Sequence, residues 1–353
     1  MTEPTTTDDG TLVDTQLLAL RDLLSSTWIP HAIHAATALN VPDHLAKGPR
    51  RADDLAAEVD ADPVALERLM RALVTIDVLA HGDAGTFALG PLGQLLRSDG
   101  QHSLRGRVLL TAGKRSHRSW NEFLDIVRTG QTAVKILDGI DDPFAWFRER
   151  PEEQARFDAA MAEGTGIMAQ AIATAYDFSG LRTIVDVGGG YGTLLVPVLQ
   201  AHPDLRATVL DQAHCADGAR RLIEGAGLAD RYAFVAGDFF EPGSLPTGAD
   251  AYVLKSVIHD WDDARSLNLL RLVREAMPDH GRLLVVEVVV PDRLDQSPEA
   301  RRMIWADLNM MVATGGRERT ESQYRSMLAA SGFRLDRIVP TTAGIDIIEA
   351  TPA

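Results

Sequence analysis

The feature that most constrains this sequence is a glycine-rich turn placed between a short apolar run and a helical segment. The run Thr183–Val187 is typical of a buried strand, and it leads directly into Gly188, Gly190 and Gly192. A helix is predicted next, over 193–201. Glycine lets a backbone turn tightly and approach a bound molecule closely. The order strand, glycine turn, helix therefore predicts a ligand site at the carboxyl end of the strand.

The same alternation of strands and helices continues to the end of the chain. Further strands are predicted at 207–211, 232–236, 251–255 and 282–290, with helices at 215–226 and 262–276. A late strand at 344–350 could pair at the edge of the sheet. This pattern predicts the α/β class: a Rossmann-like, mostly parallel sheet with helices on both faces.

The first half of the chain has a helical pattern instead. Apolar residues recur at helical spacing from 12 to 39, and two short helices are predicted at 51–59 and 62–73. Asp62 is a typical N-cap and Pro63 suits the first helical position. A hairpin is predicted at 78–89. Together these elements are similar to a winged-helix module.

Four segments are therefore expected. These are a disordered tail at 1–11, a winged-helix-like dimerisation domain at 12–100, a helical linker or lid at 101–178, and a catalytic domain at 179–353. A winged helix can bind DNA, but Glu67 stands beside Arg68 and Arg71 in its second helix. A packing and dimerisation role is favoured.

Charge and cysteine content limit the partners of the chain. Its 35 basic and 50 acidic residues give a net charge of −15, which argues against a nucleic-acid or anionic-membrane surface. Cys215 has no second cysteine to pair with, and it is expected to be buried. No signal peptide and no membrane-spanning stretch are predicted, so the expected location is cytoplasmic.

Three acids are predicted to lie around the glycine turn. Asp211 ends the next strand, 19 residues after Gly192, where it could accept hydrogen bonds from ribose hydroxyls. Gly237, Asp238 and Phe239 follow the third strand, where a carboxylate and a ring could hold an adenine. Because the carboxyl ends of parallel strands meet at one edge, these groups should share a site with Asp186.

The turn alone also fits a dinucleotide. Two residues favour a different ligand. Thr193 stands where a dinucleotide site would need glycine, and Asp186 lies two residues before Gly188. A carboxylate at that position suits a cationic amino-acid group better than a pyrophosphate.

A histidine with two glutamates is predicted at the same edge. His259 follows the fourth strand, Glu287 ends the fifth, and Glu318 lies in a glycine-containing loop. An imidazole in a cleft can act as a general base near neutral pH. A carboxylate on one imidazole nitrogen fixes the tautomer and raises the basicity of the other nitrogen.

An aromatic tract precedes the sheet. Phe144, Trp146, Phe147 and Phe157 fall in or next to predicted helices. Aromatic residues at helical spacing are usually core, but these could also line a pocket for a flat molecule.

With these residues assembled, the chain resembles the S-adenosylmethionine-dependent O-methyltransferases of class I that act on small molecules. The resemblance is carried by DVGGGYG at 186–192, GDFF at 237–240, LKSVIHDWDD at 254–263 and GGRERT at 315–320. Plant phenolic and bacterial polyketide-tailoring enzymes share this pattern. The resemblance implies an enzyme of secondary metabolism and antibiotic biosynthesis. It also implies a homodimer formed through the N-terminal helices.

The resemblance also implies roles for individual residues. His259 would be the catalytic base, flanked by Glu287 and Glu318. Cofactor contacts are implied for Thr165, Asp186, Gly188, Gly190, Gly192, Asp211, Gly237, Asp238, Phe239 and Lys255. Contacts to the acceptor are implied for Met161, Asp260, Trp305, Asn309, Met310 and Ala313. No metal is expected.

The predicted function is therefore transfer of a methyl group from S-adenosylmethionine to a hydroxyl of a small aromatic molecule. An alternative keeps the fold and cofactor but uses the sulfonium charge for hydroxylation or decarboxylation of an aromatic polyketide. The intact set of His259, Glu287 and Glu318 favours methyl transfer.

Overall fold

A computed structural model describes residues 9–100 and 102–353. The chain forms two compact units, Met1–Ser116 and His117–Ala353. Residues 1–8 of the expected tail lie outside the described residues, and helix α1 begins at Asp9. The expected segment 101–178 spans the boundary between the two units.

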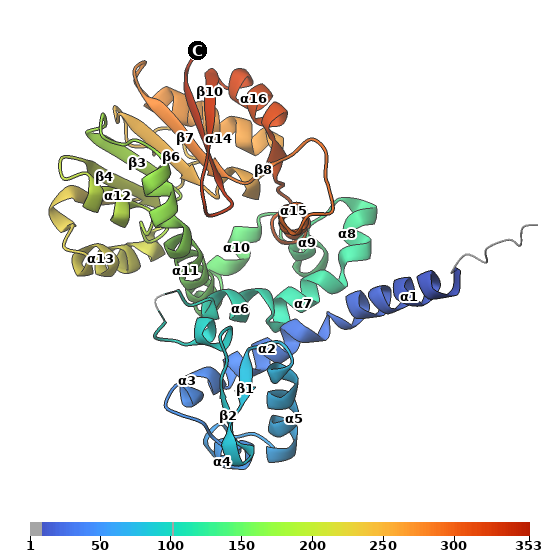
Figure 1. Ribbon diagram of the computed structural model, residues 1–353. Helices are drawn as coiled ribbons and strands as arrows, with labels where there is room; N and C mark the ends of the chain where they lie inside the picture. The colour runs from blue at the N-terminus through green and yellow to red at the C-terminus, as the bar shows by residue number, and fades with distance from the viewer. Residues whose placement is uncertain (1–8, 101) are drawn as a thin grey trace, which may run out of the picture. The chain divides into compact units, whose positions relative to one another are not determined.

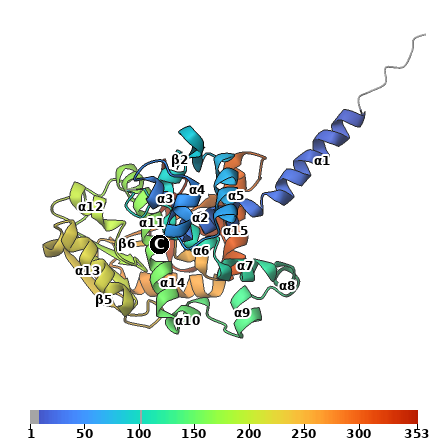
Figure 2. The same ribbon diagram turned by 90° about the horizontal axis from the view of Figure 1, so that it is seen from below.

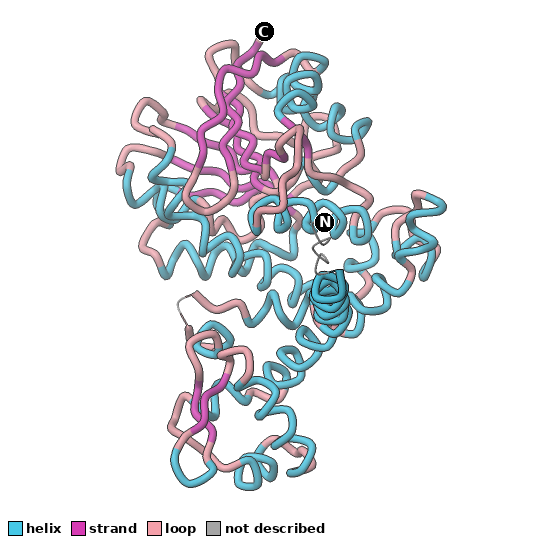
Figure 3. Tube along the Cα trace, turned by 45° about the vertical axis from the view of Figure 1, so that its right-hand side comes forward, coloured by secondary structure: helices cyan, strands magenta, loops and turns pink. Residues whose placement is uncertain are grey.

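The first unit is mostly helical, with one small hairpin, drawn in magenta among helices in Figure 3. Its elements are α1 (Asp9–Ser25), α2 (Trp28–Ala38), α3 (Val41–Leu45), α4 (Ala52–Glu58), α5 (Pro63–Val74), β1 (Leu79–His81), β2 (Phe87–Leu89) and α6 (Arg105–Thr111). Helix α7 (Lys114–Asn121) crosses the unit boundary.

The predicted winged-helix pattern is present in this unit. Helices α4 and α5 are followed by the antiparallel pair β1–β2. Asp62 caps α5 by accepting a hydrogen bond from the backbone N–H of Ala65 at 2.8 Å. The module has an apolar core of its own, in which Leu55, Met70 and Leu73 are fully buried. Burial of these side chains holds the two helices on the hairpin.

The second unit is built on a seven-stranded sheet. Its strands are β3 (Thr183–Val187), β4 (Arg206–Asp211), β5 (Tyr232–Ala236), β6 (Ala251–Lys255), β7 (Arg282–Glu287), β10 (Phe333–Pro340) and β11 (Asp346–Pro352). A separate parallel pair is formed by β8 (Val289–Val290) and β9 (Arg319–Thr320). Its helices are α8 (Phe123–Thr129), α9 (Ala133–Asp138), α10 (Pro143–Arg148), α11 (Pro151–Ala175), α12 (Leu195–Ala201), α13 (Ala216–Gly225), α14 (Asp263–Ala276), α15 (Pro298–Ala313) and α16 (Glu321–Ala330).

The strand order is β10-β11-β7-β6-β3-β4-β5. Strands β7, β6, β3, β4 and β5 pair in parallel, and β5 forms one edge beside α13 (Figure 2). The chain builds the sheet outward from β3 in one direction and then returns to add β6 and β7 on the other side. This reversal at β3 opens a crevice at the carboxyl ends of the strands, where ligands bind in open α/β sheets.

Helices cover both faces of this sheet, as the sequence pattern predicts. One core joins the sheet to α14 and α16, and a second joins it to α11, α12 and α13 (Figure 1). Val185 and Val187 of β3 face the first core, while Ile184 faces the second. Apolar residues on both faces of the strand explain why it reads as a continuous apolar run.

The predicted edge position of the late strand is wrong. Strand β11 lies inside the sheet, antiparallel to both β7 and β10, and β10 is the edge strand. The sequence pattern of β10 concealed it, because Arg334, Asp336 and Arg337 interrupt the apolar residues. Among the described residues, no helix is both long and apolar enough to cross a membrane.

Candidate active site

A cavity of about 490 Å³ lies at the carboxyl ends of β3, β4 and β6. Most of the predicted cofactor residues line it: Thr165, Asp186, Gly188, Gly190, Asp211, Asp238, Phe239 and Lys255. Gly192 and Gly237 are in the same turns but are not among the lining residues. Five separate stretches of sequence thus converge on one cavity.

The glycine turn faces this cavity with its backbone. Gly188, Gly190 and Gly192 all have positive φ, between 57° and 74°, a region that side-chain-bearing residues rarely adopt. The N–H of Gly190 donates to Oδ2 of Asp211 at 2.6 Å. A Cβ added at Gly190 would meet no atom within 4 Å, so the turn borders open space at this point.

Asp186 is a buried carboxylate without a partner among the described residues. Its side chain is 1 % exposed, and neither oxygen accepts a hydrogen bond there. Burial and the charge of Asp211 raise the pKa of Asp186 to about 7, against the opposing effect of Lys255. Because an unpaired buried carboxylate is costly, this position favours a ligand that brings a positive charge.

A polar contact between two elements closes one side of the cavity. Nζ of Lys255, at the end of β6, donates to Oγ1 of Thr165 on α11 at 3.1 Å. The contact connects residues 90 positions apart in sequence, and both of them line the cavity.

Aromatic rings form another wall. Phe144, Phe157, Phe239, Phe240 and Trp261 line the cavity. The ring of Phe240 packs edge-on against Trp261 with centroids 4.8 Å apart, and Phe144 lies 5.2 Å from Trp261. Both interpretations of the aromatic tract thus hold in part, because Trp146 and Phe147 form a buried cluster instead.

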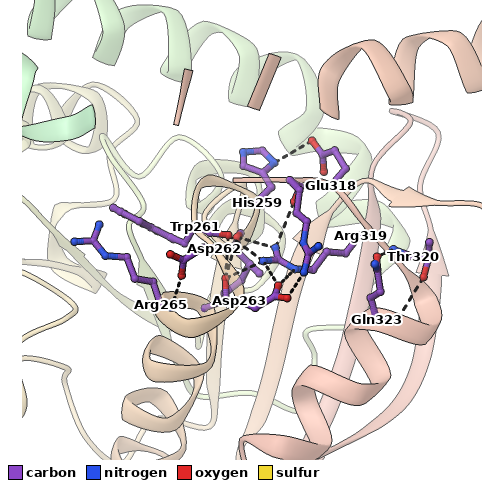
Figure 4. Close-up of polar contacts among 12 residues, drawn as sticks. His259, Trp261, Asp262, Asp263, Arg265, Glu318, Arg319, Thr320 and Gln323 are labelled. Carbon is purple, nitrogen blue, oxygen red and sulfur yellow. Dashed lines mark hydrogen bonds and ion pairs between the residues drawn. The ribbon is translucent and has the colours of Figure 1, made fainter. Parts of the chain in front are cut away.

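The histidine and the two glutamates meet beside this cavity. Nδ1 of His259 lies 2.9 Å from Oε2 of Glu287 and 3.2 Å from Oε1 of Glu318. Figure 4 shows His259 and Glu318 facing one another. Both carboxylates are almost fully buried. Both carboxylates therefore lie within ion-pair distance of the same imidazole nitrogen.

The backbone around His259 fixes Glu287 in place. Oε1 of Glu287 accepts the backbone N–H groups of Val257, Ile258 and His259 at 3.0, 2.9 and 3.3 Å. The three amide donors fix the orientation of this carboxylate. Glu287 therefore presents its second oxygen, Oε2, to the imidazole from a fixed position.

Buried charge sets the protonation of this group. Burial acts to lower the pKa of His259, but Glu287 and Glu318 act to raise it, and it lies well above its ordinary value. Burial raises the pKa of Glu318, while His259 acts to lower it. Since Nδ1 faces the carboxylates, Nε2 is the nitrogen left to exchange a proton.

Asp260 connects the histidine to the cavity. Its Oδ1 lies 3.9 Å from Nε2 of His259, and Asp260 itself lines the cavity. Burial raises the pKa of Asp260 to about 7, while the charge of His259 acts to lower it.

The residues predicted to contact the acceptor are divided in space. Met161 and Asp260 line the cavity, whereas Asn309, Met310 and Ala313 on α15 do not. Trp305 is 57 % exposed and borders a separate shallow hollow with Leu294 and Ile304. Helix α15 does reach the histidine group, because Oδ1 of Asp307 accepts the N–H of Glu318 at 2.8 Å.

Two groups of side chains in the described part of the chain have metal-ligand composition. One is His259 with Glu287 and Glu318, and the other is Asp158 with His214 and Cys215. In the first group Nδ1 of His259 already contacts an oxygen of each glutamate. The expectation that no metal takes part stays a prediction.

The sequence pattern did not indicate several residues of the site. Asp158 and His214 line the cavity and contact one another at 3.3 Å, from α11 and from the turn after β4. Arg319 is completely buried beside the histidine turn. Its place next to Glu318 in the sequence was the available signal, but an arginine in a loop is usually exposed.

Comparison with known proteins identifies the site. The family profile of the O-methyltransferase domain matches residues 120–334, and that of the O-methyltransferase dimerisation domain matches residues 21–99. The chain belongs to the O-methyltransferase family. Cavity, histidine group and aromatic wall all lie within the matched methyltransferase domain.

Curated relatives cover nearly the whole chain. A phenazine O-methyltransferase of Lysobacter antibioticus is 37 % identical over 94 % of this chain and 95 % of its own. An O-demethylpuromycin-O-methyltransferase of Streptomyces alboniger is 42 % identical over 90 % and 84 %. An 8-amino-8-demethylriboflavin N,N-dimethyltransferase of Streptomyces davaonensis is 35 % identical over 88 % of each chain.

Solved structures share the fold. The crystal structure of LaPhzM has a TM-score of 0.90 at 36 % identity, and covers 96 % of this chain and 99 % of its own. An O-methyltransferase of neocarzinostatin biosynthesis has a TM-score of 0.78 at 34 % identity, covering 92 % and 96 %. It was crystallised with S-adenosylmethionine and 2-hydroxy-5-methyl naphthoic acid.

This methyltransferase therefore uses S-adenosylmethionine, and the cavity has the chemistry for it. The unpartnered Asp186 suits a cationic group, and the open space at Gly190 admits a ligand against the backbone. The aromatic wall offers faces for a flat ring.

Proposed function

We propose that the enzyme methylates a hydroxyl group of a small aromatic natural product and that His259 is the general base. The observation that carries this proposal is the pairing of Nδ1 of His259 with two buried glutamates. The pair lies next to Asp260, which lines the cofactor cavity. Such a pairing orients the imidazole and raises its basicity toward a hydroxyl proton, a property that a module which only binds a ligand does not need.

In this proposal, different residues of the cavity contact different parts of the cofactor. Bound S-adenosylmethionine supplies a methyl group on a positively charged sulfur. Asp186, Asp211 and Asp238 would hold its cationic, ribose and adenine parts at the strand ends. Gly188, Gly190, Thr165 and Lys255 would enclose the remainder, with Phe239 packing against the ring. We propose that Gly192 and Gly237, which lie in the same turns but do not line the cavity, shape the backbone around the cofactor.

Proton removal follows from the arrangement of His259. A phenol has a pKa near ~10, so its hydroxyl needs a base at neutral pH. Glu287, held by three backbone amides, keeps a proton on Nδ1 and leaves Nε2 free to accept one. The acceptor hydroxyl would transfer its proton to Nε2, with Asp260 beside it. General base catalysis of this kind contributes about 10²–10⁴-fold.

The proposed acceptor is aromatic because the relatives are named for aromatic substrates. Phenazine and naphthoic acid appear in their names, and the site here offers Met161 and Asp260 next to the aromatic wall. We assign Trp305, Asn309, Met310 and Ala313 to an outer part of the acceptor site on α15, which Asp307 ties to Glu318.

Two other outcomes of the same chemistry are distinguishable. Relatives named as N-methyltransferases make an amino acceptor the second candidate. Use of the cofactor charge for hydroxylation or decarboxylation is the third. Only methyl transfer turns the cofactor into S-adenosylhomocysteine.

We further propose that the enzyme is a homodimer through its N-terminal helices. The dimerisation profile supports this, as do exposed apolar side chains on α1 and at the start of α2. Leu17, Leu18, Leu20, Leu24 and Trp28 are each more than half exposed in the single chain. Apolar groups clustered this way favour a partner surface.

A screen of acceptors tests the proposed function. Purified enzyme is incubated with S-adenosylmethionine and a panel of phenols, hydroxynaphthoates, phenazines and aromatic amines, followed by mass spectrometry. We expect a gain of one methyl on a hydroxyl, with one S-adenosylhomocysteine formed for each methylated product. Methylation of amines alone would reject the hydroxyl assignment, and a modified acceptor without S-adenosylhomocysteine would reject methyl transfer.

A further inference from the structure

Arg319 is a fully buried arginine between the two segments that make up the histidine group. Its side chain is 0 % exposed, although Asp263, the carboxylate opposite it, is half exposed. A buried guanidinium with one partly hydrated counter-charge is a poor means of stabilising a fold, because an apolar side chain of similar size would do as well. Its hydrogen bonds indicate a more specific use.

The guanidinium holds the backbone on both sides of His259 and Asp260. Its Nη1 donates to the carbonyl of Ile258 at 3.0 Å, and its Nη2 donates to the carbonyl of Trp261 at 2.9 Å. Nη2 also donates to Oδ1 of Asp263 at 3.0 Å and to Oγ of Ser266 at 3.2 Å. Figure 4 shows this fan of contacts from Arg319 beneath His259.

The backbone of Arg319 is fixed from the other direction. It pairs with Val289 in the small β8–β9 ladder, two residues after Glu287 in the chain. Glu318 directly precedes Arg319. Arg319 therefore connects the turn that carries His259 with β8, which follows Glu287, and with the loop that carries Glu318.

A glycine in the same loop shows how closely the two segments approach. A Cβ added at Gly316 would lie 1.9 Å from the carbonyl oxygen of His259 and 2.5 Å from the carbonyl carbon of Asp260. The loop thus touches the histidine turn at three points: the backbone of Gly316, the carboxylate of Glu318 and the guanidinium of Arg319.

We propose that Arg319 is a positioning residue that sets the contact between His259 and Glu318 by clamping the turn Ile258–Trp261 to the segment of Glu318. The planar fork of arginine reaches two carbonyls and a carboxylate at once, which the single ammonium of lysine cannot reproduce. The consequence for proton removal rests on the proposed role of His259, whereas the clamp itself does not.

The test compares two arginines that share one aspartate. Arg319→Lys keeps the charge but loses the fork, and Arg319→Met keeps most of the apolar volume. Arg317→Met is the matched control, because Arg317 also pairs with Asp263 but is 45 % exposed. Each variant is labelled with ¹⁵N-histidine, and the His259 signals are followed against pH by NMR.

Arg319→Lys is expected to move the tautomer balance and the titration midpoint of His259, with Glu287, Glu318 and Asp260 as the charged groups facing it. Its kcat should fall about 10–100-fold at a nearly unchanged Kd for S-adenosylmethionine. Arg317→Met should change neither quantity. Asp263→Asn should shift the His259 signals in the same direction but less. This variant replaces the Arg319 variants in the test if both of them fail to fold.

Unchanged His259 signals in a folded Arg319→Lys protein would overturn the proposal, whatever its activity. Unchanged signals in Asp263→Asn would do so if both Arg319 variants fail to fold. Loss of kcat in strict proportion to loss of cofactor binding would also overturn it, since that pattern indicates general loosening. If the signals move while kcat stays at the wild-type value, the clamp holds and the role of His259 as base fails instead.

Discussion

Glu287 contacts His259 in two ways at once: Oε2 lies 2.9 Å from Nδ1 of the imidazole, and Oε1 accepts the backbone N–H of the same residue at 3.3 Å. The second contact belongs to a set of three amide donors. Glu287 is therefore both the orienting partner of the side chain and a fixed part of the turn. Glu318 contacts the same nitrogen from a different loop, with one oxygen buried and without a partner among the described residues.

This difference predicts unequal effects of removing the two charges. In Glu287→Gln the amide oxygen can keep the three N–H donors, which turns the NH₂ group toward Nδ1. The imidazole would then carry its proton on Nε2, where a base must be free. We expect kcat to fall about 10–100-fold. Glu318→Gln leaves Glu287 in place and should lower kcat less.

Steady-state kinetics of both variants, with the Kd for S-adenosylmethionine measured by calorimetry, checks this order. Equal losses in the two variants, or a larger loss in Glu318→Gln, would contradict the assignment of Glu287 as the orienting carboxylate.

The raised pKa of His259 predicts an alkaline shift of the pH profile. The free base is the active form, so kcat should rise with pH, with a midpoint above the ordinary histidine value of about 6.5. The effect on stability has the opposite sign. Because the folded pKa is raised, the stabilisation by the charge pairs is complete below about pH 6.5 and is lost as pH rises through the folded pKa.

Measurement of kcat and of thermal unfolding from pH 5 to 10 tests both signs. A kcat that levels off below pH 6, or an unfolding temperature that does not decline at alkaline pH relative to His259→Gln, would contradict this prediction.

The raised pKa of Asp186 predicts that this residue destabilises the cofactor-free fold while it favours cofactor binding. A carboxylate whose pKa is raised to about 7 in the folded state destabilises the fold increasingly as pH rises above its unfolded value of about 4. Asp186→Asn should therefore raise the unfolding temperature of the cofactor-free enzyme at pH 8. The same change should weaken the binding of S-adenosylmethionine by about 10–100-fold, because the cationic group of the cofactor loses its charge partner.

Differential scanning calorimetry and titration calorimetry at pH 8 measure the two effects. Asp204→Asn is a suitable control, because Asp204 is exposed and is not a lining residue of the cavity. If Asp186→Asn leaves the Kd unchanged, Asp186 does not face the cationic group.

The assignment of His259 as the base also predicts that activity is insensitive to chelators. His259, Glu287 and Glu318 could hold a metal by geometry alone. If the imidazole is the base, exhaustive treatment with EDTA should leave kcat unchanged, and added Zn²⁺ should inhibit by occupying Nδ1. Loss of activity in EDTA that Mg²⁺ or Zn²⁺ restores would contradict the base mechanism.

Much of this site follows from local sequence order. Asp186 and Asp211 lie at the carboxyl ends of β3 and β4, and Asp238 and His259 follow β5 and β6 by two and four residues. Parallel strands bring these ends together. Glu287 could be placed in the same way, since it ends β7. Periodicity thus predicts both the fold class and the edge on which these residues meet.

The parts that escaped prediction depend on contacts between distant segments. The position of β11 inside the sheet is set by its pairing with β7 and β10, which no local pattern encodes. Arg319 has the composition of a surface residue and is buried only because three carbonyl or carboxylate partners meet around it. The residues predicted to contact the acceptor on α15 do belong to one helix, but the spacing of apolar residues along it does not show which cavity they face.

The most direct test of His259 as the general base is the variant His259→Ala, measured for cofactor binding and for turnover in the same preparation. His259 is not among the residues that line the cofactor cavity, so the Kd for S-adenosylmethionine should stay within about threefold. Formation of S-adenosylhomocysteine on the true acceptor should fall by about 100-fold or more. Undiminished turnover, or a loss explained entirely by weaker cofactor binding, would contradict the assignment of His259 as the base.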